Sequence, residues 1–312
     1  MLSRRSIRIK VMQLLYTLSR DEELSFNEVL KLYDQHVDES YQLLLYNIYV
    51  LIEITRNAEV DYKNRRKKHL PSDYDKVFTD KLFSNETIQG LIKNKSFQAL
   101  SKKFQFSDRL DLDLTKKIYL DFSKEKEYEN YILKKDSSKN DNLNILLEMY
   151  RYCRKSEIFE EMLVDQYLNY EDDKSLIVGG TKKILKSDNT ASIDFAKEYY
   201  PEEEIVQDFG KILLKRTFQE ENTLSEIIKP QLKNWDHDRV AIIDMILIKM
   251  AAIEFQDFET IPTKVTINEY LDISKDYSTP KSNEFINGML DTILVKLTEE
   301  GKVNKSGRGL KE

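Results

Sequence analysis

One stretch near the C-terminus, residues 240–255, reads VAIIDMILIKMAAIEF and constrains the fold more than any other part of the chain. Its large apolar residues recur at spacings of three and four, which is the repeat of one face of an α-helix. They are Val240, Ile243, Ile246, Leu247, Met250 and Ile253. Because further apolar residues fill the neighbouring positions, the stripe is too broad for a helix that lies on a surface. The stretch therefore predicts a core helix that other helices surround.

Residues that end helices are scarce in the whole chain, which has 312 residues but only 8 Gly and 5 Pro. Charged residues make up 33% of it, and Leu, Ile, Lys and Glu are abundant, so most segments favour helix over turn. We therefore expect an all-α protein. Its length allows roughly one to three domains, with two as the central expectation.

The net charge of −6 and the isoelectric point near 5.5 exclude a protein that coats nucleic acid with its whole surface. A local basic patch stays possible. Cys153, the single cysteine, lies in a helical pattern with no histidine close in sequence, and we interpret it as a packing residue. A single cysteine cannot form an intramolecular disulfide. Because His36, His69 and His237 are far apart in sequence, no metal site is expected, and we expect no cofactor. A reducing, cytoplasmic location fits this cysteine usage.

No catalytic signature is found in the chain. It lacks the glycine-rich phosphate loops, the zinc-binding H-E-x-x-H helix and the G-x-S-x-G elbow. The acidic groups Glu202–Glu204 and Asp236/Asp238 are typical of helix caps and solvated faces. No apolar run reaches the ~18 residues that a membrane-spanning helix needs. We therefore expect a protein that is neither an enzyme nor bound to a membrane.

The N-terminal segment RRSIRIKVMQLLY predicts a helix with Ser3 as its N-cap. Four basic residues lie within seven positions of it without an intervening acid: Arg4, Arg5, Arg8 and Lys10. They predict a positive patch whose guanidinium groups contact successive phosphates. The plain alternative is a solvated N-terminal arm. The run KNRRKKH at residues 63–69 allows the same two interpretations.

A helix from about Ser25 to His36 is expected to open with a capping box of Ser25 and Glu28, and a separate one is expected over Ser40–Asn57. Pro71 ends this region. Eight short helices are then predicted: Tyr74–Phe83, Glu86–Asn94, Ser96–Lys103, Leu114–Phe122, Glu125–Lys134, Asn142–Arg151, Ile158–Tyr170 and Ser175–Leu185. Loops are expected at KKDSSKNDN and LKSDNTAS.

After Pro201, which opens a helix, the helical repeat becomes sharper. The last helices are predicted at Leu224–Ile228, at the stretch 240–255, at Val265–Asp276 and at Lys281–Leu297. Asn287-Gly288 in the last of them is a typical hairpin signal, but apolar residues recur every four positions across it. We therefore expect a mid-helix glycine that permits close approach of a neighbouring helix, with Asn287 bridging to that helix.

Three ordered segments carry a resemblance to a known family: WDHDRVAIIDMILIKMAAIEF, IPTKVTINEYLDISKDYS and KSNEFINGMLD. They are similar to the W-x-x-x-R core helix, the P-x-K-V-x-I-N-E helix and the S-x-x-F-[VI]-N-G-[VM]-L-D helix of the transcription antitermination factor NusB family. The N-terminal RRSIRIKVMQLLY also resembles the arginine-rich first helix of that family.

The resemblance implies a NusB-like pair of small helix bundles, formed by residues 1–37 and 200–300, with an additional helical insertion at 38–199. Residues 301–312 are expected to be a flexible basic tail. The family binds boxA RNA together with NusE, a ribosomal protein that also acts in elongation. The implied function is therefore antitermination on ribosomal RNA operons, within the RNA polymerase elongation complex.

Carried over by position, Arg4, Arg5 and Arg8 match the RNA-binding arm, of which Lys10 is the last basic residue. Ser282 and Phe285 match an RNA surface on the last helix, where an exposed aromatic ring could stack on a base. The positions that face NusE in the family are matched by Tyr16 and Asp244. Glu284 departs from the family, because many members carry a basic residue there.

Two other interpretations are considered, of which the first stays open. The first is a non-catalytic scaffold that docks NusE or RNA polymerase and has weakened or lost its RNA contact. The second is an RNA cytosine methyltransferase with a NusB-like N-terminal domain. It is disfavoured, because the chain has no glycine-rich cofactor loop and no Pro-Cys pair.

Overall fold

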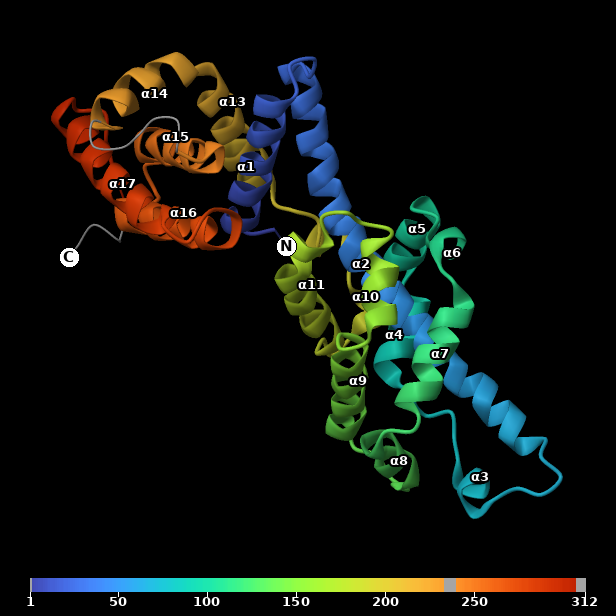
Figure 1. Ribbon diagram of the computed structural model, residues 1–312. Coiled ribbons are helices and arrows are strands. Elements are labelled where there is room, and N and C mark those ends of the chain that lie inside the picture. The colour runs from blue at the N-terminus through green and yellow to red at the C-terminus, as the bar shows by residue number, and fades with distance from the viewer. Residues whose placement is uncertain (1, 233–239, 307–312) are drawn as a thin grey trace. The chain divides into compact units, whose positions relative to one another are not determined.

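The computed structural model describes residues 2–232 and 240–306. Within these ranges every regular element is a helix (Figure 1), which confirms the all-α prediction. No helix among these residues has both the length and the apolar character needed to cross a membrane. The expectations for Asp236, His237 and Asp238 fall on residues 233–239, outside the described part of the chain.

The chain divides into two compact units. Leu2–Val37 and Pro201–Glu312 make up the first, called the terminal unit below. Asp38–Tyr200 makes up the second, the middle unit. The sequence predicts the division after residues 37 and 199. Helix α2 (Phe26–Arg66) begins in the terminal unit and continues into the middle unit.

The terminal unit is built around α15 (Ile242–Asp257), which packs against helices on several sides. Ten of its residues are buried, from Asp244 to Phe255, so the prediction of a core helix from the broad apolar stripe is confirmed. Its neighbours are α1 (Arg4–Arg20), α13 (Ile212–Gln219), α14 (Glu221–Ile228), α16 (Thr263–Tyr277) and α17 (Ser282–Glu299). A π-helical segment, η2 (Glu204–Lys211), precedes α13, and a short 3-10 helix, η3 (Lys229–Leu232), follows α14.

The first two helices begin where the capping residues predict. The Ser3 hydroxyl accepts a hydrogen bond from the Ser6 amide at 3.2 Å. Ser25 donates its backbone amide to the Glu28 carboxylate at 2.9 Å, which completes the reciprocal part of a capping box. Both caps satisfy amides that have no partner within the helix.

Helix α2 corrects one prediction, because Ser25–His36 and Ser40–Asn57 belong to one helix of 41 residues. The two predicted helices leave a break at Val37–Glu39, which holds neither Gly nor Pro. Val37 is buried like Tyr33 and Tyr41 on either side of it, so the apolar face continues through the expected break. The helix ends at Arg66, before Pro71.

The middle unit packs short helices around the rest of α2 (Figure 1). They are α3 (Asp73–Val77), α4 (Glu86–Lys93), α5 (Lys95–Lys103), α6 (Phe106–Arg109), α7 (Leu112–Phe122), α8 (Lys126–Leu133), α9 (Lys139–Cys153), α10 (Glu157–Val164), α11 (Tyr170–Leu185), the 3-10 helix η1 (Thr190–Ser192) and α12 (Phe195–Glu198). Three of these, α6, η1 and α12, were not predicted. Helix α9 begins inside an expected loop, because Ser138 and Asp141 form a capping box there.

Gly288 lies in mid-helix as predicted, but the expected reason for it is wrong. A Cβ atom at Gly288 would meet no other atom within 4 Å, and both Asn287 and Gly288 are exposed. Among the described glycines of the terminal unit, the close approach occurs at Gly210 instead. A Cβ there would lie 1.9 Å from the Tyr33 hydroxyl and 2.5 Å from a methyl carbon of Ile7, so η2 can pack on α1 and α2 only with glycine at this position.

The segment after α17 is held against the terminal unit, which corrects the expected flexible tail for the residues up to 306. The Lys305 ammonium donates to the backbone carbonyls of Glu254 and Phe258, each at 2.9 Å. The Ser306 amide donates to the Glu259 carbonyl at 3.0 Å. Lys305 therefore places a cation on the last turn of α15, where the helix dipole favours positive charge.

Candidate nucleic-acid and partner interface

The first turn of α1 carries two arginines to the surface of the terminal unit. The Arg4 side chain is 40% exposed and pairs with Glu204 at 3.1 Å. The Arg5 side chain is 37% exposed and pairs with Asp272 at 3.4 Å and Asp276 at 3.6 Å. Exposed pairs of this kind contribute about 0–1 kcal/mol each. Both guanidinium groups can therefore exchange a carboxylate for a phosphate at little cost.

Arg8, the third arginine of the predicted patch, lies in the interior. Its side chain is 2% exposed and forms two parallel hydrogen bonds with Glu254, at 2.8 Å from Nε and 2.6 Å from Nη2. Its guanidinium also lies 5.1 Å from the centre of the Phe209 ring. The expectation that Arg8 faces solvent is therefore wrong, and the reason is this ion pair between α1 and α15.

The Glu254 carboxylate, on which this pair depends, has further donors. Thr266 donates its hydroxyl at 2.8 Å and Tyr270 donates its hydroxyl at 3.1 Å. Burial opposes the charge on Arg8, but the hydrogen bonds and the charge of Glu254 outweigh it and raise the pKa of Arg8. Burial and the Glu254 charge likewise raise the pKa of Tyr270. Arg8 thus stays charged and anchors α1 to α15 and α16.

Lys10, the last basic residue of the predicted patch, is 1% exposed, so its place in a solvent-facing patch is also corrected. The six residues Ile7–Met12 are all buried, so this part of α1 is enclosed on every side, which a one-sided apolar stripe in the sequence does not indicate. The patch therefore consists of Arg4 and Arg5.

Two further predicted residues, Asp244 on α15 and Ser282 at the start of α17, contact each other in the interior of the terminal unit. Asp244 is 4% exposed and Ser282 is 2% exposed. The Asp244 carboxylate accepts hydrogen bonds from Ser282 at 2.7 Å and from Ser278 at 2.5 Å. Ser282 in turn accepts from the Thr279 amide at 3.2 Å. The cluster fixes the turn between α16 and α17 to α15, so Asp244 and Ser282 do not present a surface to a partner or to RNA.

Phe285 is 5% exposed, so the expected exposed ring for base stacking is not present at this position. The outward face of α17 carries Glu284, Asn287, Gly288 and Asp291 instead, all of them exposed. This face is acidic and would repel phosphate. Tyr16 on α1 is the one residue of the predicted partner surface that is exposed, at 40%.

A hollow of about 560 Å³ opens beside Arg4 and Arg5 in the terminal unit. Carboxylates of Glu202, Glu204 and Glu269 lie around it with the two arginines. Ile205, Ile261, Pro262 and Val265 form an apolar part of the wall, and Ser3, Arg8 and Thr260 complete it. The hollow thus combines an apolar wall with charged groups of both signs.

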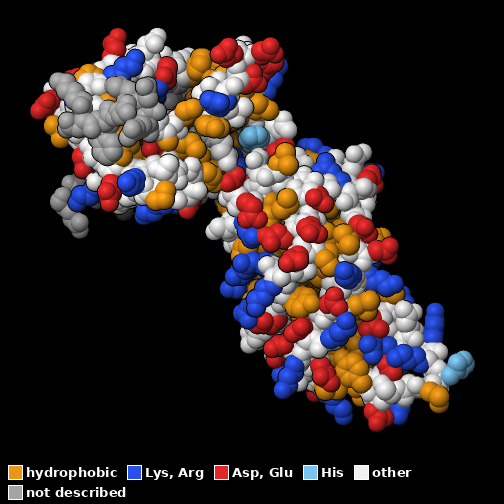
Figure 2. Space-filling view, in the orientation of Figure 1, with side chains coloured by type: hydrophobic (Ala, Val, Ile, Leu, Met, Phe, Trp, Pro, Cys, Tyr) orange, Lys and Arg blue, Asp and Glu red, His pale blue; other side chains and the backbone are white. Residues whose placement is uncertain are grey.

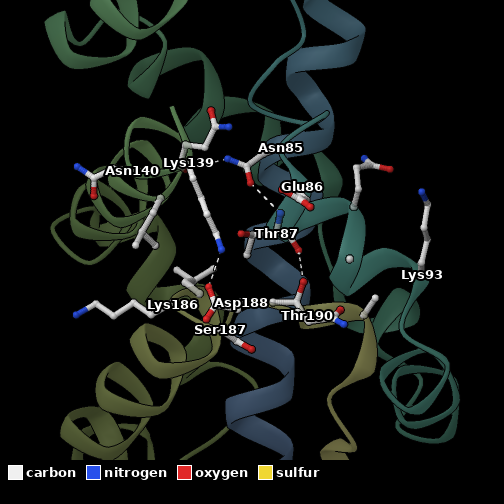
Figure 3. A pocket seen from close by; sticks show the side chains of 17 residues that line it. Asn85, Glu86, Thr87, Lys93, Lys139, Asn140, Lys186, Ser187, Asp188 and Thr190 are labelled. Carbon is white, nitrogen blue, oxygen red and sulfur yellow. Dashed lines mark hydrogen bonds and ion pairs between the residues drawn. The ribbon is translucent and has the colours of Figure 1, made fainter. Parts of the chain in front are cut away.

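The middle unit has a hollow of similar size, also about 560 Å³, which Figure 3 shows from close by. Lys139 pairs with Asp188 across it at 2.6 Å, whereas Lys93 and Lys186 extend away from it. Its buried polar groups are satisfied, since Asn85 donates to the Asn142 carbonyl and Thr190 donates to the Thr87 carbonyl, each at 2.8 Å. Charge does not converge in this hollow, so we do not assign the site to it.

The basic run at residues 63–69 uses most of its charge within the middle unit. Asp75 accepts hydrogen bonds from Arg65 at 2.7 Å and from Lys68 at 3.0 Å. Lys63 pairs with Glu59 at 2.7 Å. On the face shown in Figure 2, basic and acidic side chains are interspersed over the middle unit. Because its exposed pairs are as weak as those of Arg4 and Arg5, the run keeps both interpretations, a phosphate contact or a solvated face. Among the residues that the structure describes, no group of three His, Cys, Asp or Glu is arranged to hold a metal ion.

Comparisons with known proteins point to one family. A family model described as the NusB family matches residues 160–294. The chain is 41% identical over 109 residues to the transcription antitermination protein NusB of Salinibacter ruber, which covers 35% of this chain and 68% of that protein. It is 33% identical over 111 residues to the protein of the same name from Desulfatibacillum aliphaticivorans, covering 36% of this chain and 77% of that protein. For the NusB of Chloroherpeton thalassium, the identity is 36% over 119 residues, or 37% of this chain and 56% of that protein. No solved structure matches the chain.

Proposed function

Because the chain belongs to the NusB family, we propose that it acts in transcription antitermination by binding boxA-type RNA together with NusE. The relatives that support this proposal are named transcription antitermination proteins and come from bacteria. The elongation complex of RNA polymerase on ribosomal RNA operons is the proposed place of action, in the cytoplasm. The protein's part is to bind and position, without catalysis.

The observation that carries the RNA contact is the position of Arg4 and Arg5 on the first turn of α1. Their side chains are 40% and 37% exposed, and they pair with carboxylates that are themselves at least partly exposed, those of Glu204, Glu269, Asp272 and Asp276. Guanidinium groups suit phosphate because they bind it through two parallel hydrogen bonds. Arg8 supports the contact indirectly, since it fixes the helix that carries the two exposed arginines.

For the NusE contact, Tyr16 is the residue we propose. It lies three turns along α1 from the arginines and is 40% exposed, although exposure of the apolar ring of tyrosine to water is unfavourable. Tyrosine is enriched in protein interfaces because it offers a large apolar ring with a polar end. Truncation of such a ring in the centre of an interface costs about 1–2 kcal/mol or more.

The test is a salt titration of RNA binding in the presence of NusE. Each phosphate contact with single-stranded RNA contributes ~0.7 to the slope of log affinity against log salt. An Arg4→Ala/Arg5→Ala variant is therefore expected to bind more weakly and to lose about 1.4 from this slope. Arg216→Ala is the matched control, because Arg216 is 39% exposed and forms surface pairs with Asp257 and Glu220. An unchanged slope in the double variant would contradict the arginine contact.

A second candidate function, a scaffold that binds NusE or RNA polymerase without RNA, is favoured by the burial of Arg8, Ser282 and Phe285. Their burial leaves the acidic outward face of α17 where the sequence predicted an RNA surface. A pull-down with NusE, with and without boxA RNA, separates the two candidates. Capture of NusE without any captured RNA would favour the scaffold.

A further inference from the structure

The hollow beside the exposed arginines has a composition that a phosphate group does not fit. Three carboxylates lie in its wall, those of Glu202, Glu204 and Glu269, and each would repel an anion. Arg4 and Arg5 already face carboxylates from this set and from α16. Three arginines, Arg4, Arg5 and Arg8, line the hollow with these carboxylates, so its charges balance and it suits a neutral occupant whose hydrogen-bond donors the carboxylates accept.

The apolar part of the wall sets a second requirement. Val265, on the first turn of α16, is 44% exposed and faces the hollow together with Pro262 and Ile261. An exposed valine beside a half-buried proline at the side of a cavity suits the flat face of a ring. The volume of about 560 Å³ lies within the ~300–1,000 Å³ of small-molecule sites and leaves room for a planar ring of nucleobase size.

A nucleobase meets both requirements. Its faces are apolar, and the exocyclic amino groups of adenine, cytosine and guanine donate hydrogen bonds that Asp and Glu accept. Proteins that recognise single-stranded RNA commonly take an unstacked base out of the strand and hold it against a side chain. Arg4 and Arg5 stand at the rim of the hollow, within one turn of the same helix. They are placed to hold the phosphates on either side of an inserted base.

We propose that this hollow is a base-binding subsite that receives one unstacked, amino-bearing nucleobase of the bound RNA, with Val265 against its face and the carboxylates at its edge. The inference rests on the proposed function, because it requires that RNA binds at Arg4 and Arg5. It goes further in that it assigns base recognition to α16 and to the loop before it, not to the last helix.

The experiment measures binding of boxA RNA, with NusE present, after each nucleotide in turn is replaced by an abasic one. Removal of the inserted base is expected to lower the affinity of the unmodified protein about tenfold at one position, since one base contact of this kind contributes ~1–3 kcal/mol. In Val265→Trp, whose indole fills the hollow, the intact RNA is expected to bind about tenfold more weakly. The same abasic substitution should then have less than about a twofold further effect.

Val295→Trp is the matched control, because Val295 is 58% exposed on α17 of the same unit. Equal melting temperatures of the two tryptophan variants would show that a loss of binding is not a loss of folding. Val265→Met provides a smaller filling of the hollow and should show an intermediate loss. Both Val265 variants should keep the salt slope of the unmodified protein, because the phosphate contacts stay intact.

Three results overturn parts of the reasoning in different ways. Unchanged affinity of Val265→Trp for intact RNA overturns the subsite and leaves the proposed function in place. An abasic position whose loss is as large in Val265→Trp as in the unmodified protein overturns it as well. A protein that binds NusE but no boxA RNA, with or without substitutions, overturns RNA binding itself.

Discussion

Replacement of Arg8 by alanine tests whether this residue is an anchor or an RNA contact. The change removes the partner of Glu254, a carboxylate whose side chain is fully buried. Thr266 and Tyr270 would still donate to it, but the carboxylate would lose its only directly hydrogen-bonded cation among the described residues. Removal of one member of a buried ion pair costs about 3–5 kcal/mol.

This loss is large for a domain of this size. A destabilisation of 1 kcal/mol lowers the melting temperature of a domain of ~150–250 residues by about 2–4 °C. Arg8→Ala should therefore melt roughly 6–20 °C below the unmodified protein, as followed by circular dichroism. Arg5→Ala, which removes only exposed pairs, should change the free energy of unfolding by less than about 1 kcal/mol.

The double variant Arg8→Met/Glu254→Gln gives the sharper comparison. It removes both charges, while an amide oxygen at position 254 still accepts hydrogen bonds from Thr266 and Tyr270, so most of the lost stability should return. If Arg8 acts only as an anchor, RNA affinity should return with it. If the double variant regains stability but still does not bind RNA, Arg8 is more than an anchor and contacts the RNA itself. A loss below about 1 kcal/mol in Arg8→Ala would refute the buried pair itself.

Three further predictions concern other parts of the chain. Gly288→Ala should stabilise the terminal unit by up to about 1 kcal/mol in urea unfolding, because the added Cβ meets open space. Gly210→Ala should destabilise the unit by about 1–3 kcal/mol, because the added Cβ overlaps the Tyr33 side chain. The opposite order of the two variants would contradict the packing described for η2. Hydrogen bonds from Lys68 and the Ser72 backbone hold the pKa of Asp75 below its ordinary value of 3.8, so its contribution to stability is present above about pH 4 and is lost as the pH falls below that value. Asp75→Asn should therefore flatten the acid limb of the pH–stability curve, and an unchanged curve would argue against the Arg65–Asp75–Lys68 cluster. Lys305→Ala should lower the melting temperature of the terminal unit by a few degrees through loss of the cap on α15, and an unchanged value would show that the segment after α17 adds no stability.

Local signals predicted the elements of this fold well where a cap or a broad apolar stripe marks them. Ser3, Ser25 and the stretch 240–255 each gave the right start or the right burial. The failures have a common physical origin, since they concern what two distant segments do to each other. Nothing near Val37 indicates whether its apolar face finds a partner, and that partner decides whether α2 continues.

The candidate site was predicted at the level of its segments and less well at the level of single side chains. A basic residue was assumed to face solvent, but Arg8 meets Glu254, which is 246 positions away in sequence. Phe285 was assigned to the surface although Met289, Ile293 and Leu297 continue its buried stripe along α17. For Phe285 the helical repeat gave the correct orientation and the residue type the wrong one, whereas Arg8 is buried because α1 is enclosed on every side over Ile7–Met12. The hollow beside Arg4 joins segments from three parts of the chain, so no local pattern could have predicted it.

Arg4 and Arg5 belong to a helix that is capped by Ser3 and anchored one turn later by Arg8. This preformed helix affects the entropy and the rate of RNA binding. A disordered basic arm loses conformational entropy when it binds, whereas a preformed helix has little left to lose. Encounter should then be limited by diffusion and charge steering, with no folding step and only a small change in heat capacity. The helix also fixes the direction in which the two arginines point. One residue inserted between Arg5 and Arg8 would turn both arginines by about 100° around the helix axis, so that they no longer face the hollow.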